Sequence, residues 1–284
     1  MSGEIAFANT ALESFAALVT FVLLFACIAK IKMQRGIKHV TSKEAKRNTL
    51  DYILIIWLVI HMIVLTADVL SWTAMDFGKN EVWLLFMLNL TFTCLSLECM
   101  VYTYYVKETI YQHEKIGNTY VYLVMLSTVI AIILWITSDI SGKFYYLDTQ
   151  GNYTQGSIYW LCQFYCIIVM CGNIVILLKH RKALVRHDVL SLLMYGLIPI
   201  ASIPAQMLWK STTFNLATTL VLIYICISVH MAQYDRIVEQ EKILIQQEHE
   251  LSMNQMQMMI AQIQPHFLYN SLTALAQLCS KDPK

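Results

Sequence analysis

The chain has 284 residues, of which 57% are hydrophobic and 14% are charged, and its formal net charge is +1. A soluble globular domain carries about a quarter charged residues, so this composition excludes an ordinary soluble protein. A net charge so close to zero also gives no reason to expect a nucleic-acid partner. Apolar runs of the roughly 20 residues that a helix needs to cross a bilayer recur along the chain, which predicts an all-α, multi-pass membrane protein surrounded by lipid.

Seven apolar segments follow one another in the chain, and we expect each of them to be a membrane-spanning helix. Together they predict a seven-transmembrane helix bundle that forms a sensor domain over residues 1–233. No Lys or Arg precedes the first segment, so we interpret it as a retained span and not as a cleaved signal peptide. The predicted spans are residues 8–30, 50–72, 82–106, 118–138, 157–178, 189–208 and 214–233.

Positively charged residues are distributed unequally over the connections between these spans. The first, third and fifth connections hold twelve Lys and Arg residues, whereas the second, fourth and sixth hold three, namely Lys79, Lys143 and Lys210. Positively charged connections stay in the cytoplasm. We therefore expect the N-terminus outside the cell and everything after about residue 233 inside it.

The longest outer connection lies between spans 4 and 5 and reads DISGKFYYLDTQGNYTQGS. Its runs FYYLD and NYT flank the turn residues TQG, and this pattern is typical of a small β-hairpin. We expect an extracellular β-hairpin that acts as a lid. The alternative is that its tyrosines belong to an aromatic belt at the membrane interface.

Ionisable side chains inside the spans are candidate functional positions, because such groups are costly to place in a membrane. Glu13 and Asp68 fall in the outer halves of the first and second spans, and His61 and Glu98 lie deeper. The alternative is that all four are hydrogen-bonding groups that hold the bundle together.

The sixth span is interrupted by two prolines, which free backbone groups and suit either a pocket or a hinge. Tryptophans also fall near the outer ends of several spans. We therefore hypothesise an outward-facing pocket for an unidentified signal ligand, covered by the hairpin. Its candidate ligand-binding residues are Glu13, Asp68, Trp72, Trp135 and Pro199.

The cysteines do not indicate a metal site. Cys162 and Cys166 lie four residues apart on one predicted helix, but no His or carboxylate accompanies them there. Structural metal sites need a fuller set of ligands, so we predict no metal in this chain.

After the last span, residues 234–260 contain no Gly or Pro and consist mostly of good helix formers. Apolar residues recur every seven positions, which predicts a parallel coiled coil and therefore a homodimer. The alternative, an amphipathic helix on the membrane surface, is disfavoured by the acidic residues of this segment. The apolar repeat is Ile237, Leu244, Leu251 and Met258, and it is interrupted by the polar residues Gln240, Gln247 and Asn254.

The stretch AQIQPHFLYNSL, which begins at Ala261, contains one of the four prolines directly before a histidine. On a helix, His266 and Asn270 are four residues apart and share a face. Pro265 lacks a backbone N–H, so we expect it to bend the helix beside the imidazole. A neutral, solvent-facing imidazole is a good nucleophile at physiological pH, which makes His266 a candidate catalytic residue.

The residues QIQPHFLYNSL resemble the phosphoacceptor box of the LytS/YesM-type sensor histidine kinases, whose pattern is close to Q-[IL]-x-P-H-F-[LI]-[FY]-N-x-[LI]. The resemblance implies that His266 is the autophosphorylated histidine, with Pro265 beside it, and that Asn270 orients the imidazole or the attacking group of the regulator. It also implies a location in the bacterial inner membrane. The phosphoryl group would pass to an aspartate on a response regulator, often one with a LytTR-type DNA-binding domain.

This resemblance covers only about residues 255–282. The acceptor hairpin of the family has a second helix, and its ATP-binding domain holds Mg-ATP with asparagine- and glycine-rich boxes, neither of which follows His266 here. We therefore expect residues 261–284 to be the truncated start of a phosphoacceptor domain, with no cofactor site in this chain and no activity alone. Phe267 stands where the more widespread histidine-kinase box has an acidic residue, so no local general base is visible.

Two other classes of membrane protein agree with parts of the pattern. A seven-span receptor of the G-protein-coupled type has the same span count and sidedness, but the third span here ends in CMVYTYYVKE, without an acidic–arginine pair. A transporter would have inverted repeats with helices broken at matching positions, and only the sixth span is interrupted. Neither class accounts for residues 262–272, so the histidine kinase is the favoured prediction.

Overall fold

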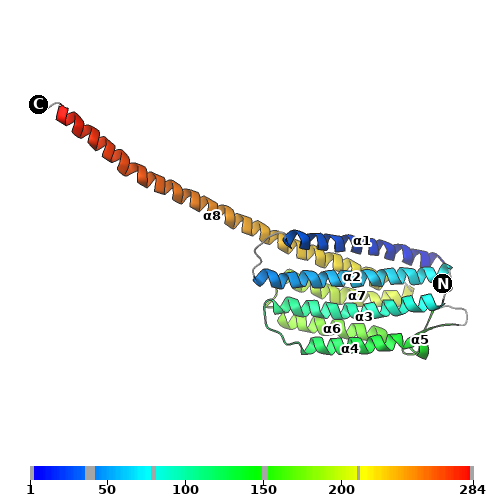
Figure 1. Ribbon diagram of the computed structural model, residues 1–284. Helices are drawn as coiled ribbons and strands as arrows, with labels where there is room; N and C mark the ends of the chain where they lie inside the picture. The colour runs from blue at the N-terminus through cyan, green and yellow to red at the C-terminus, as the bar shows by residue number, and fades with distance from the viewer. Residues whose placement is uncertain (1–2, 36–41, 78–80, 149–152, 210–211, 282–284) are drawn as a thin grey trace. The chain divides into compact units, whose positions relative to one another are not determined.

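The computed structural model describes residues 3–35, 42–77, 81–148, 153–209 and 212–281, and almost all of them are helical (Figure 1). The chain divides into two compact units, Met1–Ser228 and Val229–Lys284. The first unit is a bundle of long helices, and the described residues of the second unit form part of a single helix.

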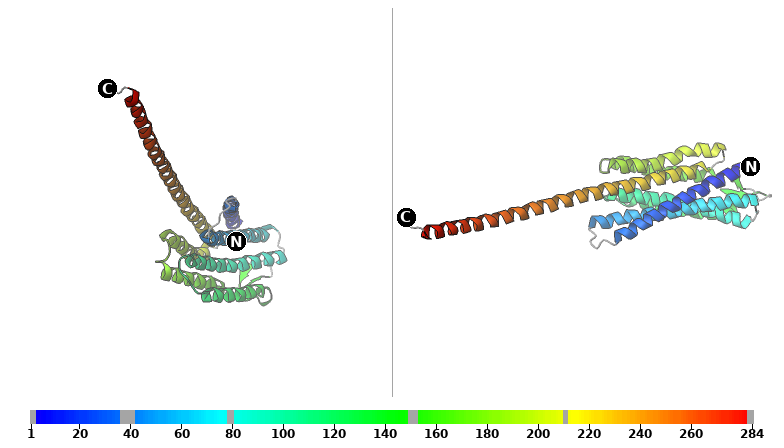
Figure 2. Two further views of the ribbon diagram at one scale, coloured as in Figure 1. Left: turned by 60° about the vertical axis from the view of Figure 1, so that its left-hand side comes forward. Right: turned by 90° about the horizontal axis from the view of Figure 1, so that it is seen from above.

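The helices of the first unit pack mainly against their neighbours in the sequence. The helix α2 packs against α1 and α3, α3 also contacts α4 and α6, and α6 contacts α7. These long helices lie side by side in Figure 1 and in both views of Figure 2. The bounds are α1 (Gly3–Arg35), α2 (Ser42–Phe77), α3 (Glu81–Tyr111), α4 (Thr119–Ile136), α5 (Ser138–Ser141), α6 (Trp160–His180), α7 (Arg186–Trp209) and α8 (Thr213–Lys281).

Within the described residues, six helices contain apolar stretches long enough to cross a membrane, which indicates a multi-pass membrane protein. They coincide with six of the seven predicted spans. The other predicted span, residues 157–178, corresponds to α6, whose apolar part Phe164–His180 is shorter. The six stretches are Phe7–Lys32, Thr49–Ala74, Glu81–Tyr111, Thr119–Ile136, Arg186–Gln206 and Thr213–Met231.

The first helix shows which side chains the bundle buries. Glu13, Ala16 and Thr20 are buried, whereas Phe15 and Phe25 are exposed, Phe25 by 67%. The buried residues are small or polar and recur at helical spacing on one face, while large apolar side chains face outward. This arrangement is typical of membrane helices, because lipid covers the outer face while close packing and hydrogen bonds hold the inner face.

An aromatic cluster joins α2, α3 and α7 inside the bundle. The ring of Trp57 lies 5.6 Å from those of Tyr102 and Tyr105 and 4.5 Å from that of Tyr195, centroid to centroid. All four side chains are buried. Tilted and edge-to-face ring pairs have preferred geometries, so this cluster fixes how the three helices pack.

The predicted β-hairpin between α4 and α6 is present. Its strand β1 (Tyr145–Leu147) pairs antiparallel with β2 (Tyr153–Gln155). The predicted turn falls in residues 149–152, which lie outside the described residues.

The hairpin packs on α3 and α4 through aromatic side chains. Tyr145 is fully buried and stacks on Phe92 at 5.1 Å between ring centroids. Phe144 meets the ring of Trp135 edge-on at 5.0 Å. At least Tyr145 is therefore a core residue, and the alternative of an interfacial belt does not describe it.

The second unit contains the continuation of α8 from Val229 to Lys281. The helix predicted over residues 234–260 is present. Three residues of its apolar repeat, Leu244, Leu251 and Met258, are exposed, Leu251 by 60%, and the side chain of Ile237 lies outside the described residues. Pairing of this apolar face with a second chain stays a prediction.

Candidate functional site

The first candidate site is the part of α8 around His266. The helix continues through Pro265 and ends at Lys281, so the proline does not terminate it. The structure describes the helical backbone at His266, but the imidazole lies outside the described residues. The predicted bend at Pro265 stays a prediction.

The described side chains near His266 are open to the surroundings. Pro265, Phe267, Tyr269 and Asn270 are exposed, Tyr269 by 72%. Asn270 follows His266 by one helical turn, as the spacing predicts. This accessibility suits an acceptor residue, because a separate domain must bring a phosphoryl group within bonding distance of it.

The second candidate site is an acidic pair at one end of the bundle. Asn215 Nδ2, at the start of α8, donates to Glu13 Oε1 of α1 at 2.9 Å and to Asp68 Oδ2 of α2 at 2.8 Å. Ser71 Oγ lies 3.4 Å from the other Asp68 oxygen, Oδ1. Glu13 is 0% exposed, and its Oε2 has no hydrogen-bond partner among the described residues. One amide thus ties α1 and α2 to α8.

A second polar cluster surrounds Glu98, on α3. Tyr195 donates to Glu98 Oε1 at 2.7 Å, and Trp57 Nε1 donates to the same oxygen at 3.3 Å. His61 Nδ1 lies 3.1 Å from it, a close contact without the alignment of a hydrogen bond. On its other side, His61 Nε2 is 2.9 Å from Thr219 Oγ1 of α8.

The two polar clusters meet on α8. Asn215 and Thr219 are four residues apart and share a face. Thr219 Oγ1 also donates to the backbone carbonyl of Asn215 at 2.8 Å. A continuous set of polar contacts therefore runs from Glu13 and Asp68, through two residues of α8, to His61 and Glu98.

The structure brings together only part of the predicted ligand-binding set. Glu13 and Asp68 are joined through Asn215. Trp135 belongs to the hairpin cluster, where its Nε1 donates to Ser96 Oγ at 2.8 Å. Pro199 is buried in α7, and its carbonyl accepts from Ser202 Oγ.

Trp72 follows Asp68 by one turn of α2. Its indole N–H is buried and has no hydrogen-bond partner in the part of the chain that the structure describes. A ligand role for any of these five residues stays a prediction.

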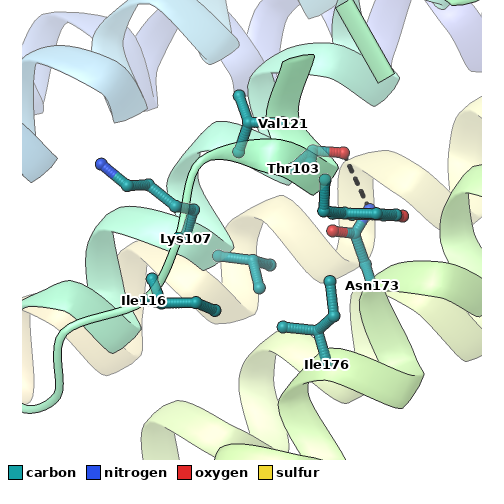
Figure 3. Close-up of a pocket in the computed structure, with 9 residues that line it drawn as sticks. Thr103, Lys107, Ile116, Val121, Asn173 and Ile176 are labelled. Carbon is teal, nitrogen blue, oxygen red and sulfur yellow. Dashed lines mark hydrogen bonds between the residues drawn. The ribbon is translucent and has the colours of Figure 1, made fainter. Parts of the chain in front are cut away.

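Figure 3 shows a recess between α3, α4 and α6, on helices other than those that carry Glu13 and Asp68. Asn173 Nδ2 donates to Thr103 Oγ1 at 2.9 Å. Asn173 Oδ1 accepts no hydrogen bond from the described part of the chain. None of the predicted ligand residues is among those that line it. This recess is therefore not the predicted signal pocket.

The residues of α8 that contact the acids were not predicted. Asn215 and Thr219 stand four apart in a largely apolar span, and this spacing was the available signal. Tyr195 and Trp57 were also missed, because buried aromatics in a membrane helix look like ordinary packing residues.

Comparison with known families identifies one segment. A family model described as histidine kinase matches residues 254–284, which include His266 and make up about a tenth of the chain. The chain matches no curated protein. Together with the six long apolar helices, the matched segment suggests a membrane protein of histidine kinase lineage and, by that lineage, a two-component sensor kinase.

Proposed function

We propose that this chain is the sensory and phosphoacceptor part of a bacterial two-component sensor histidine kinase of the LytS/YesM type. The observation that carries the proposal is the histidine-kinase match over residues 254–284, on the same helix that begins in the bundle at Thr213. A receptor coupled to G proteins or a transporter would account for the bundle but not for this segment.

In this proposal His266 is the phosphoacceptor. Its imidazole attacks the γ-phosphoryl group of Mg-ATP held by a catalytic domain of the kinase, and a phosphoramidate N–P bond forms as ADP leaves. The phosphoryl group then passes to an aspartate of a response regulator, possible partners including those with LytTR-type DNA-binding domains. Asn270, one turn away, orients the imidazole or the incoming regulator, and Pro265 shapes the helix beside it.

The proposed topology has seven spans, with α6 as the fifth, in the bacterial inner membrane. The N-terminus is outside, and His266 is in the cytoplasm, as the excess of Lys and Arg in the first, third and fifth connections supports. The hairpin of β1 and β2 then lies on the extracellular side.

We further propose that the kinase is a homodimer through residues 234–260. An exposed apolar repeat on a long helix is stable in water only when another surface covers it, and the seven-residue spacing favours a second, parallel copy. Gln247 and Asn254 are exposed on the same helix and weaken the seam, which leaves the coil able to change its packing when the bundle changes state.

A signal acts in this scheme by binding one state of the bundle more tightly than another. Asn215 and Thr219 of α8 contact the acidic pair and His61, so α8 is bonded directly to α1 and α2. A change in these contacts changes the helix that carries His266.

The proposal is tested by labelling the full-length kinase in membrane vesicles with radioactive Mg-ATP. His266→Gln is compared with His249→Gln, an exposed histidine on the same helix outside the matched segment. We expect His266→Gln to lose the acid-labile label and His249→Gln to keep it. Wild-type labelling in His266→Gln would overturn the assignment.

A further inference from the structure

Most buried carboxylates described in this bundle face a basic side chain. The pairs are Asp51 with Lys30 at 2.7 Å, Glu108 with Lys107 at 3.2 Å and Glu98 with His61 at 3.1 Å. Glu13 and Asp68 differ from them. The hydrogen bonds that the structure gives these two carboxyl groups come from Asn215 and Ser71, which are both uncharged.

The donors at this pair do not satisfy its acceptors. An asparagine amide has two N–H groups, and Asn215 donates one to Glu13 Oε1 and the other to Asp68 Oδ2. Glu13 Oε2 is then left without a donor from any side chain that the structure describes, although it is completely buried. A buried carboxylate oxygen without a donor is destabilising, so something other than Asn215 must serve it.

The two carboxyl groups also lie within hydrogen-bonding reach of each other. Two ionised carboxylates cannot make a hydrogen bond, since neither carries a donor, and two like charges this close repel each other strongly inside a membrane. A single proton removes both difficulties. It halves the charge of the pair and supplies the O–H group that Glu13 Oε2 lacks.

We propose that Glu13 and Asp68 form a proton-binding site that couples external pH to the output helix α8. The proposal deepens the sensor function above, because it names the proton as a signal that the bundle reads. It rests on the proposed kinase only for the output at His266.

Proton exchange has a plausible route on the proposed topology. Glu13 lies near the start of the first span, Asp68 near the end of the second and Asn215 near the start of the span in α8, so all three lie at the outer end. Asp68 is partly exposed, whereas Glu13 is not. When the site is deprotonated, the O–H bond between the two acids breaks and the proton leaves to external water. Two carboxylates then accept hydrogen bonds from the single amide of Asn215.

The loss of this proton acts on α8 through Asn215. With both acids ionised, their repulsion favours separation of α1 from α2, and the amide that bridges them must release one of the two. Thr219, one turn further along α8, contacts His61, which in turn lies beside Glu98. A shift of α8 therefore also changes the contacts of Glu98.

The titratable side chains that face this network come from four elements. They are Glu13 on α1, Asp68 and His61 on α2, Glu98 on α3 and Tyr195 on α7, while α8 contributes the uncharged Asn215 and Thr219. Variants must therefore separate the acidic pair from the His61–Glu98 cluster.

The experiment is an infrared difference titration of the purified chain in lipid nanodiscs. A protonated carboxyl group has a C=O stretching band that an ionised one lacks. The chain has 19 Asp and Glu residues, and each of them shows this band when protonated. The pair is therefore identified by the component of the wild-type titration that both Glu13→Gln and Asp68→Asn lose. We expect this component to disappear in wild type as the pH rises. Each substitution keeps the shape of the side chain, and Glu250→Gln, an exposed glutamate of the tail, should titrate like wild type.

Two results would overturn the proton site. One is a carboxyl titration that is the same in wild type and in both variants. The other is a transition that follows sodium concentration at fixed pH when sodium is exchanged for choline, which would make the site one for a metal cation.

The link to the output is measured separately in the full-length kinase. We expect His266 phosphorylation to change by about 5-fold or more over the same titration, as for typical coupled sites, and to become flat in Glu13→Gln. A flat profile in the wild-type kinase would overturn the coupling to α8. A normal infrared titration without any phosphorylation at His266 would contradict the proposed kinase function while leaving the proton site in place.

Discussion

The bundle and the tail of this chain both expose apolar side chains, but in different surroundings. In the first helix of the bundle, large apolar residues such as Phe25 face outward and polar ones such as Glu13 face inward. In the second unit, the apolar repeat that includes Leu251 is exposed on a helix whose acidic residues are exposed as well. Lipid covers the outward apolar face of a membrane bundle, whereas we propose that a second copy of the chain covers the apolar face of the tail.

The comparison predicts that substitutions inside the bundle cost the most and that those on its lipid face cost little. Trp57→Ala removes a completely buried ring that three tyrosines contact, so we expect a loss of about 3–5 kcal/mol in the free energy of unfolding. The measurement is denaturant unfolding in bicelles. Phe25→Ala, on the exposed face of α1, serves as the control, and an equal loss in both variants would contradict the orientation of the helices.

Substitutions in the tail should weaken dimerisation only at positions that a second chain covers. Leu251→Ala removes one seam residue from each copy, and we expect a loss of about 1.5 kcal/mol per chain in the free energy of dimerisation. Energy transfer between labelled copies of the full-length kinase in proteoliposomes measures this. Met253→Ala, which is exposed but off the repeat, is the control. Equal effects of the two substitutions would argue against a coiled coil with this register.

Polar contacts inside the bundle should be worth less than its aromatic packing. Tyr195→Phe removes the O–H group that donates to Glu98 at 2.7 Å and leaves a buried carboxylate poorly satisfied, so we expect a loss of about 1–3 kcal/mol in stability. Tyr122→Phe, at an exposed position of α4, should be neutral in the same unfolding measurement. If the two variants are equally stable, the Glu98 cluster is not a structural element of the bundle.

The smallest expected effect is at the contact between α8 and His61. Thr219→Val removes the hydroxyl that lies 2.9 Å from His61 Nε2, with an expected loss of about 0.5–1.5 kcal/mol. Thr218→Val is the matched control, because its hydroxyl bonds the Phe214 carbonyl of its own helix. A larger loss in the control than in Thr219→Val would remove the special role of this contact.

Much of the fold could be predicted from the sequence, because a bilayer sets the length of each apolar run. Six predicted spans match helices of sufficient length, and the alternation of aromatics around TQG predicted the hairpin of β1 and β2. The span predicted over residues 157–178 is the exception. The apolar stretch that can be followed in α6 begins at Phe164, because the side chains of Cys162 and Gln163 lie outside the described residues.

The candidate site was predicted less completely, because an apolar helix does not reveal which of its faces points inward. Glu13 and Asp68 could be grouped, since a charged group in a span must face the protein interior. Their partner Asn215 carries no charge and gave no such signal. Trp135 was grouped with them by its depth alone, whereas its rotation on α4 places it under the hairpin beside Phe144.

The central claim is that the bundle delivers its signal to a phosphorylated His266. Its most direct test is mass spectrometry of the full-length kinase, digested under alkaline conditions after incubation of membranes with Mg-ATP. We expect a phosphohistidine in the peptide that contains PHFLYN, at His266. Phosphate confined to any other residue, or absent from this peptide in an active kinase, would contradict it.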